Sequence, residues 1–296
     1  MGKNSSTRHI SEVGNYGDAR EYYASKYVLE NAQPNDPDAI LRALEMFDVR
    51  WTMLHLGMEK GEYLDMALKE LIAERRKKQL NCEVPDDGRP NPIRALEVGA
   101  YIGYSAIRMG RILVTEAEQG STLLSVEQNY DNARYAKIHV EYAGLNETVK
   151  VLHSRVENCF DETTNEFEVR NDENRNSSMD PNRGSRPYDF VFFDHRKPFY
   201  LRDLKLLESR GIIDASVTTL VADNVASLQH LKNREEAIAR GKRKGPCKCV
   251  NNACNYLAYV RNRWSSTKIF YGNSTKDGIS ISKPAYGSDF KNLKLL

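Results

Sequence analysis

The sequence predicts an α/β fold built on one doubly wound, mostly parallel sheet. Short, mostly apolar runs alternate with segments of helical spacing from residue 95 onward. Runs of only four such residues are typical of central parallel strands that are covered on both faces. A glycine turn follows the first run and leads into a helical segment. Alternation of this kind favours a single layered α/β domain.

Five runs are expected as strands, at residues 95–98, 123–126, 149–152, 190–193 and 219–222. Three segments between them are expected as helices, at residues 104–114, 131–142 and 200–207. Two further helices are expected ahead of the sheet. The first begins at Asp36-Pro37, because aspartate can cap free amides and proline suits the first helical position. The second carries four apolar residues on one face, namely Leu64, Leu68, Leu71 and Ile72.

The chain has 296 residues and a net charge of +2. This length suits one large domain, expected at residues 16–296 after a flexible N-terminus at residues 1–15. The near-neutral charge argues against a general nucleic-acid binder, and the lack of a long apolar run argues against a membrane span. Without the apolar core of a signal peptide, a cytoplasmic protein is predicted, and a monomer is favoured. Gly2 and Ser6 match the N-myristoylation pattern, which alone would give only weak anchoring.

Two polar segments interrupt the expected domain. Residues 161–187 contain almost no apolar side chains and are expected to form a disordered surface insertion. Residues 229–254 contain a basic run at 240–245, which favours a solvated loop over a nucleic-acid patch. The same segment holds three of the five cysteines, Cys247, Cys249 and Cys254. Their spacing supplies only part of a zinc site unless His230 completes it, so free thiols in a reducing compartment are favoured.

Ligands of doubly wound sheets bind beyond the carboxyl ends of the strands, so the residues after each run are candidates for a site. After the first run, Gly99 and Gly103 allow the backbone to turn sharply and to approach a ligand closely. Tyr101 stands where a dinucleotide fingerprint has its second glycine, which leaves less room for a pyrophosphate. Glu127 ends the second run, where a carboxylate can accept hydrogen bonds from both hydroxyls of a ribose.

Oxygen-bearing side chains follow two further runs. Asp194 comes directly after the fourth run, and Asp223 and Asn224 come directly after the fifth. Hard oxygen ligands suit Mg²⁺, which prefers six near-octahedral positions and keeps some water. Three protein oxygens, two substrate oxygens and one water would fill those positions. The sequence therefore predicts a magnesium site that receives a bidentate small molecule.

Together these motifs resemble the catechol O-methyltransferase family. The similar stretches are LEVGAYIGYS at 96–105, FFDHRKPFY at 192–200 and ADN at 222–224, with W-x-M-x3-G-x2-K-G at 51–61 upstream. The resemblance covers about residues 20–230 apart from the polar insertion. Caffeoyl-CoA-type methyltransferases share the metal-binding set but usually differ in the glycine turn and after the first aspartate, so His195 favours the catechol family.

The resemblance implies a Rossmann-like methyltransferase fold, S-adenosylmethionine as methyl donor and Mg²⁺ as cofactor. It implies that the methionine part of the donor contacts Glu97, Gly99, Tyr101 and Ser105. It further implies that Glu127 holds the ribose and that His195 lies near the adenine. The implied metal ligands are Asp194, Asp223 and Asn224, and the implied general base is Lys197. The implied substrate-side residues are Trp51, Met53, Arg196 and Asn224.

Two departures from the family pattern affect the substrate side. Arg196 stands where the family usually has an aromatic wall, which suggests a preference for acidic catechols, because a guanidinium can pair with a carboxylate. The family's late glutamate has no clear counterpart, and segments around Ala258 and Asp277 are rival alignments. The leading expectation is a catechol O-methyltransferase. The alternatives are an O-methyltransferase for another vicinal diphenol, such as a phenylpropanoid or flavonoid, and a non-catalytic donor-binding or interaction protein.

Overall fold

A computed structural model describes residues 17–80, 92–160, 186–227, 248–272 and 277–284. These residues form a sheet of seven strands, β1 (Arg94–Val98), β2 (Thr122–Glu127), β3 (Val149–His153), β4 (Phe190–Phe193), β5 (Thr219–Ser227), β6 (Ser266–Tyr271) and β7 (Asp277–Lys283). The spatial order is β3-β2-β1-β4-β5-β7-β6. The strands β1 to β5 pair in parallel, whereas β7 is antiparallel to both β5 and β6. The predicted doubly wound α/β fold is confirmed.

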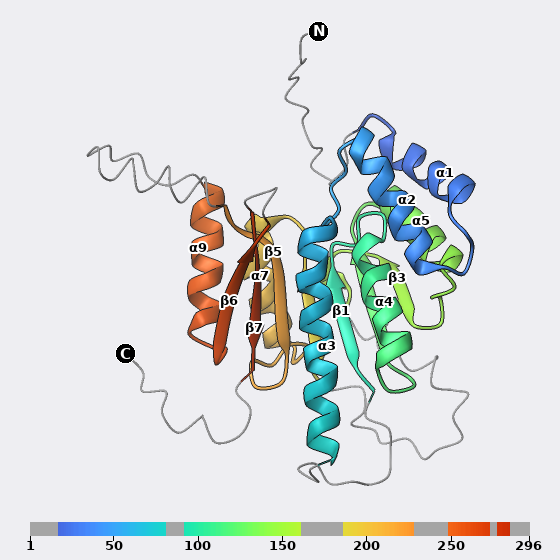
Figure 1. Ribbon diagram of the computed structural model, residues 1–296. Helices are drawn as coiled ribbons and strands as arrows, with labels where there is room; N and C mark the ends of the chain where they lie inside the picture. The colour runs from blue at the N-terminus through green and yellow to red at the C-terminus, as the bar shows by residue number, and fades with distance from the viewer. Residues whose placement is uncertain (1–16, 81–91, 161–185, 228–247, 273–276, 285–296) are drawn as a thin grey trace.

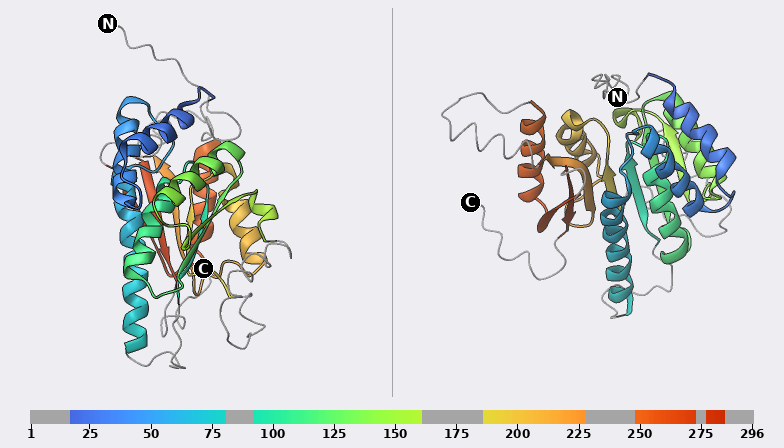
Figure 2. Two further views of the ribbon diagram at one scale, coloured as in Figure 1. Left: turned by 90° about the vertical axis from the view of Figure 1, so that its right-hand side faces the viewer. Right: turned by 45° about the horizontal axis from the view of Figure 1, so that its top comes forward.

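Helices cover both faces of the sheet (Figures 1 and 2). One face carries α3 (Met58–Leu80), α4 (Tyr104–Glu116) and α5 (Tyr130–Tyr142), with α1 (Arg20–Asn31) and α2 (Pro37–Arg50) packed beside them. The other face carries α7 (Tyr200–Ser209) and α9 (Lys248–Arg261). Alternate residues of the central strands enter the two cores. Phe190 and Phe192 of β4 lie in the first, and Val191 and Phe193 lie in the second.

Helix α2 begins where the sequence predicts. The side chain of Asp36 accepts a hydrogen bond from the backbone N–H of Ala39 at 2.9 Å, which satisfies one of the free amides at the start of α2. Pro37 follows it in the first turn. Helix α3 is 23 residues long and runs along the sheet beside β1, so its first turn lies near the carboxyl ends of the parallel strands (Figure 1).

Four elements were not expected from the sequence. These are α1, α9, β6 and β7. The predicted insertion at 229–254 is too long at its C-terminal end, because Lys248 already begins α9. Cys249 and Cys254 therefore belong to a helix, and the described part of the chain holds no cluster of three or more His, Cys, Asp or Glu side chains suited to a metal.

Several predictions fall on parts of the chain that the structure does not describe. They concern the flexible N-terminus with Gly2 and Ser6, residues 161–185 of the first insertion, and residues 229–247 of the second with Cys247 and His230. Within the described ranges, no helix is both long enough and apolar enough to cross a membrane.

Candidate functional site

The turn after β1 is tight enough to require glycine. Gly99 has φ +102°, and a Cβ atom there would lie 2.7 Å from the backbone of Asp194 and of His195. Gly103 has φ +91°, and its missing side chain lets α5 approach at Ala136. The loop after β1 and the loop after β4 are thus in direct contact at the carboxyl edge of the sheet, where ligands of this fold class bind.

Glu97 joins three elements below this turn. Its carboxylate is fully buried and accepts hydrogen bonds from the hydroxyls of Ser105 on α4 and Ser125 on β2. Burial raises the pKa of Glu97 to about 7, although the two hydroxyls oppose the shift and the nearby Glu127 adds to it. The expected donor-binding residues Glu97 and Ser105 therefore contact each other, and any ligand group would have to share these oxygen atoms.

The raised pKa of Glu97 makes stability depend on pH. Because the folded protein keeps the proton between pH 4.5 and about 7, the free energy of unfolding falls as pH rises through this window. We expect Glu97→Gln to remove this loss. From pH 5 to pH 8, the free energy of unfolding of the variant should therefore rise by about 3 kcal/mol relative to that of wild type, measured by urea unfolding. Glu30→Gln, at an exposed site on α1, is the control, and a pH-independent difference for Glu97→Gln would contradict the account.

Glu127 closes the same region from the end of β2. One carboxylate oxygen accepts the backbone N–H of Tyr101 at 2.9 Å, and the other accepts that of Asn129 at 2.8 Å. Burial raises its pKa to about 7 against the effect of these backbone donors. The backbone of Gln128 is a third donor to this carboxylate, so of its roughly four acceptor sites one remains for a ribose hydroxyl. The phenol of Tyr101 donates to Glu21 of α1 at 2.9 Å, an acid that the sequence analysis did not single out.

A bulge in β5 shapes the next part of the site. The register with β7 shifts between Ala222 and Ala226, and Asn224 adopts φ +53°. Asparagine tolerates this left-handed conformation better than most residues, and a bulge redirects side chains. The amide Nδ2 of Asn224 donates to Oδ2 of Asp277, the first residue of β7. Because β7 is antiparallel to β5, its start lies at the same edge as the end of β5.

Lys60 lies between the acids at this edge. Its ammonium group, on the first turn of α3, is 2.6 Å from Oδ2 of Asp223 and 3.5 Å from Oδ2 of Asp277. Burial lowers the pKa of Lys60, but the charge of Asp223 and the hydrogen bond to it outweigh burial, so the pKa lies above its usual range. Lys60 is part of the W-x-M-x3-G-x2-K-G stretch, but nothing in the sequence indicates that it reaches Asp223.

Asp194 and Asp223 are close enough to repel each other. They follow Phe193 and Ala222, which are directly paired in the β4–β5 register. Burial raises the pKa of Asp194 well above its usual value, and the charge of Asp223 raises it further. Burial also raises the pKa of Asp223, against the opposing effect of Lys60. Two carboxylates in one desolvated site create a strong demand for positive charge.

The predicted metal ligands fit a divalent ion in their chemistry. Oδ1 of Asp223 is buried and has no hydrogen-bond partner among the described residues, while Oδ2 is held by Lys60. The amide nitrogen of Asn224 is occupied by Asp277, which leaves its oxygen for another partner. The set contains two carboxylates and one amide oxygen, the type of ligand that Mg²⁺ takes.

The residues after Asp194 have different environments. The ring of His195 is held by Asp203, which lies 2.9 Å from Nε2, and Nδ1 is buried without a partner in the described part of the chain. Burial lowers the pKa of His195, although Asp203 opposes the shift. Lys197 begins a short 3₁₀ turn and is close enough to lower the pKa of both Asp194 and Asp223 by its charge. Arg196 is exposed, with its guanidinium 5.6 Å from the ring of Phe199.

Known proteins match this chain over the region that carries the site. Residues 90–240 match the O-methyltransferase family. A protein of Mycobacterium tuberculosis named "Probable O-methyltransferase" is 32% identical over 221 residues, 74% of this chain and 78% of that protein. The chain belongs to the O-methyltransferase family. Catechol O-methyltransferase of Bos taurus is 31% identical to this family member over 211 residues, 71% of this chain and 62% of the bovine protein. The predicted family resemblance is confirmed.

Solved structures agree on the fold of this O-methyltransferase family member. A Staphylococcus aureus structure described as a putative caffeoyl-CoA O-methyltransferase has a TM-score of 0.53 at 15% identity, covering 90% of this chain and 99% of that one. A Podospora anserina methyltransferase bound to SAH has a TM-score of 0.52 at 14% identity, covering 94% and 100%. At these identities the likeness extends to the Rossmann-like fold alone.

Trp51 and Met53 lie on the segment between α2 and α3 of the family member. Trp51 is 45% exposed, and the guanidinium of Arg20 from α1 lies 6.0 Å from its ring. Met53 is buried in the core on the α3 side of the sheet, and its backbone N–H donates to Asp48 at 2.5 Å. Of these two expected substrate-side residues on the α2–α3 segment, Trp51 is exposed and Met53 is not.

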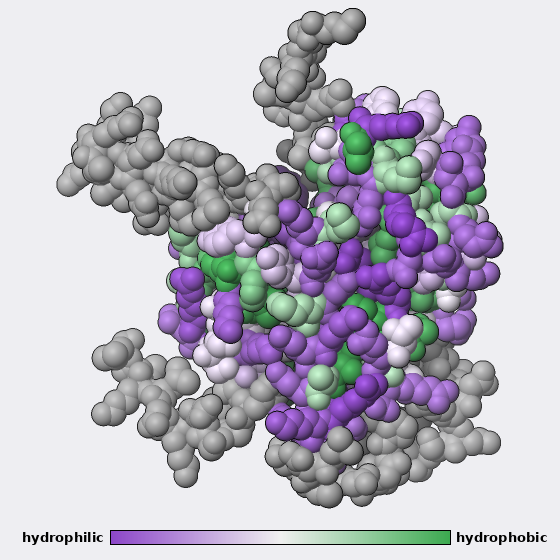
Figure 3. All heavy atoms as spheres, in the orientation of Figure 1, coloured by the Kyte–Doolittle hydropathy of each residue, from purple (hydrophilic) through white to green (hydrophobic). Residues whose placement is uncertain are grey.

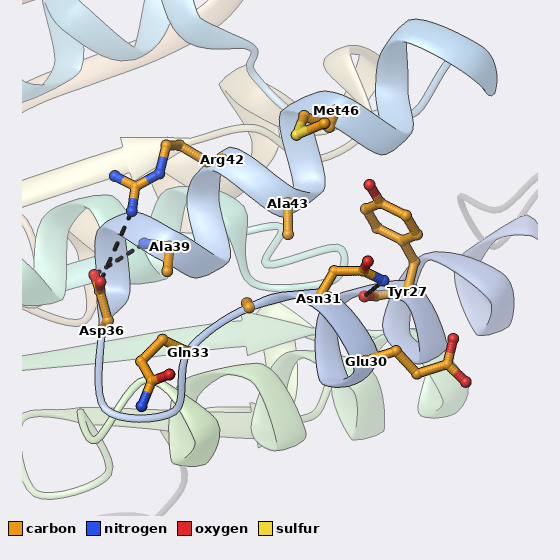
Figure 4. Close-up of a pocket in the computed structure, with 10 residues that line it drawn as sticks. Tyr27, Glu30, Asn31, Gln33, Asp36, Ala39, Arg42, Ala43 and Met46 are labelled. Atoms are coloured by element: carbon orange, nitrogen blue, oxygen red, sulfur yellow. Dashed lines mark hydrogen bonds and ion pairs between the residues drawn. The ribbon is translucent and has the colours of Figure 1, made fainter.

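An open groove of about 530 Å³ lies between α1 and α2, away from the predicted site (Figure 4). Tyr27, Glu30 and Met46 line it together with residues of the α1–α2 turn, and none of the predicted site residues does. The face of the family member seen in Figure 3 is mainly hydrophilic with small apolar patches. The groove therefore offers neither the acids nor the glycine turn that mark the carboxyl edge of the sheet.

Proposed function

We propose that the protein transfers a methyl group from S-adenosylmethionine to one hydroxyl of a catechol held by Mg²⁺. The observation that supports the proposal is that Asp194 and Asp223 lie close enough to repel each other at the carboxyl ends of β4 and β5, with Asp194 against the Gly99 turn and Asn224 directly after Asp223. Relatives named catechol O-methyltransferase support the substrate class.

Different residues of the chain would bind the donor, hold the metal and accept the proton. The turn at Gly99 and the acids Glu97 and Glu127 would hold the donor, and the ring of His195 would border it. Asp194, Asp223 and Asn224 would hold Mg²⁺, which lowers the pKa of a bound hydroxyl. Lys197 would accept the proton of that hydroxyl as general base. Positioning of the hydroxyl oxygen against the donor methyl would supply most of the rate.

Two other functions remain as alternatives. The same residues would serve an O-methyltransferase for another vicinal diphenol, such as a phenylpropanoid or flavonoid. A donor-binding protein without catalysis would need the turn and Glu127 but not Lys197 or the metal set. The buried, unpartnered Oδ1 of Asp223 favours a catalytic metal site over this second alternative.

Metal-dependent methyl transfer tests the proposal. The full chain is incubated with S-adenosylmethionine and a catechol, and methylated product is measured with Mg²⁺, with a chelator, and with Mg²⁺ restored after chelation. We expect product only when Mg²⁺ is present. Methyl transfer that persists in the chelator would contradict the metal assignment, and donor binding without product from any diphenol would favour the non-catalytic alternative.

The choice of catechols tests the substrate side. Dopamine carries a positive charge and a dihydroxybenzoate carries a negative one. A comparison of their kcat/KM values therefore shows whether the positive charge of Arg196 affects the choice of substrate. We expect the dihydroxybenzoate to be the better substrate by kcat/KM, and Arg196→Trp to reduce that preference. A preference unchanged by the substitution would show that Arg196 does not set it.

A further inference from the structure

We infer that Asp277 is a positioning residue that, with Lys60, orients the ligand oxygens of the proposed metal site. Asn224 Nδ2 donates to Oδ2 of Asp277, so the amide is turned with its oxygen away from Asp277. An amide that is free to rotate would present nitrogen as readily as oxygen, and only oxygen is a ligand for Mg²⁺. This inference rests on the proposed function.

Asp277 is itself held in place. Its Oδ1 accepts the backbone N–H of Gly278 at 2.9 Å, and its Oδ2 lies 3.5 Å from the ammonium of Lys60. The side chain is 21% exposed at the first residue of β7, which pairs with Ser227 of β5. A fixed acceptor of this kind is what an outer-shell partner of a metal ligand requires.

Lys60 orients the carboxylate of Asp223, as Asp277 orients the amide of Asn224. The ammonium of Lys60 lies 2.6 Å from Oδ2 of Asp223, and Oδ1 is buried without a partner among the described residues. In both Asp223 and Asn224, one side-chain atom is thus occupied by a positioning partner and one oxygen remains. Asp223 and Asn224 both lie in the bulge of β5, and Lys60 contacts Asp223 as well as Asp277, the partner of Asn224.

Binding of Mn²⁺ to the full chain, followed by electron paramagnetic resonance, tests the inference without any need for activity. We expect Asp277→Ala to weaken Mn²⁺ binding by about 10–100-fold, the effect of losing an outer-shell partner. Asp277→Asn keeps an oxygen acceptor and should restore most of the affinity. Glu30→Ala removes an exposed carboxylate from α1 and should leave the affinity unchanged.

Three outcomes separate this inference from the proposed function. If wild type binds no Mn²⁺, or if Asp194→Asn binds it as well as wild type, the proposed metal site is wrong. If wild type binds Mn²⁺, Asp194→Asn binds it more weakly and Asp277→Ala binds it normally, only the inference is wrong. If Asp277→Asn is as weak as Asp277→Ala, charge rather than orientation is responsible, which also overturns it. Asp277→Ser, with a side chain too short to reach Asn224, replaces the alanine variant if that one does not fold.

Discussion

Lys197→Ala is expected to lower kcat for methyl transfer by about 10²–10⁴-fold, the usual effect of removing a general base. The charge of Lys197 reaches both Asp194 and Asp223, so its amine lies near the place where the catechol hydroxyls would bind. The loss should appear in kcat, measured with saturating donor, catechol and Mg²⁺, because proton removal belongs to the chemical step.

A lysine elsewhere on the same segment provides the control. Lys205 is exposed on α7 with its ammonium 5.1 Å from the ring of Tyr259, and Lys205→Ala should leave kcat unchanged. Donor affinity, measured by calorimetry, should be the same in wild type and in Lys197→Ala. A kcat within a few-fold of wild type for Lys197→Ala would assign the proton transfer to another group.

Gly99→Ala is expected to lower the free energy of unfolding by roughly 2–6 kcal/mol, since it combines backbone strain with overpacking. The new Cβ would lie 2.7 Å from the carbonyl carbon and oxygen of Asp194 and from the nitrogen of His195. These are backbone atoms of a loop that carries the proposed ligand, so relief of the clash would move Asp194. Mn²⁺ affinity should therefore fall in the fraction that remains folded.

Gly211→Ala separates the two contributions. Gly211 has φ +69°, and a Cβ there would meet nothing within 4 Å. That variant carries only the backbone cost, about 1–2 kcal/mol, and should bind Mn²⁺ as wild type does. Urea unfolding of both variants gives the comparison. Equal destabilisation of the two would mean that the contact between the loops after β1 and β4 is not rigid.

Short apolar runs made the parallel part of the fold predictable. The expected run at 190–193 coincides with β4, and the other four runs fall within β1, β2, β3 and β5. Such strands lie between two helical layers, so they need apolar residues on both faces and leave a clear signal in the sequence. The end of each apolar run also predicted where the strand ends, and therefore that Asp194 and Asp223 lie at the carboxyl ends of β4 and β5.

The elements that were missed lack such a signal. Helix α1 buries only two apolar residues, Ala24 and Val28, and beside them it buries Arg20 and Glu21. These two charged side chains contact the backbone of Thr52 and the phenol of Tyr101. Strand β7 buries Ser280 and Ser282, although serine is polar and is usually exposed. The positions of Lys60 and Asp277 depend on these long-range contacts, which the periodicity of a single segment does not reveal.

The bond between Lys60 and Asp223 joins residues 163 positions apart and has a practical consequence for dissecting the protein. A fragment that begins at β1 would contain every described strand and nearly all of residues 90–240, the region matched to the family, yet Asp223 would lose its ion pair with Lys60. Removing one member of a buried ion pair costs about 3–5 kcal/mol, a large share of the stability of a typical domain. Helix α3 is therefore an integral part of the folded domain, and truncated versions for expression should start upstream of it.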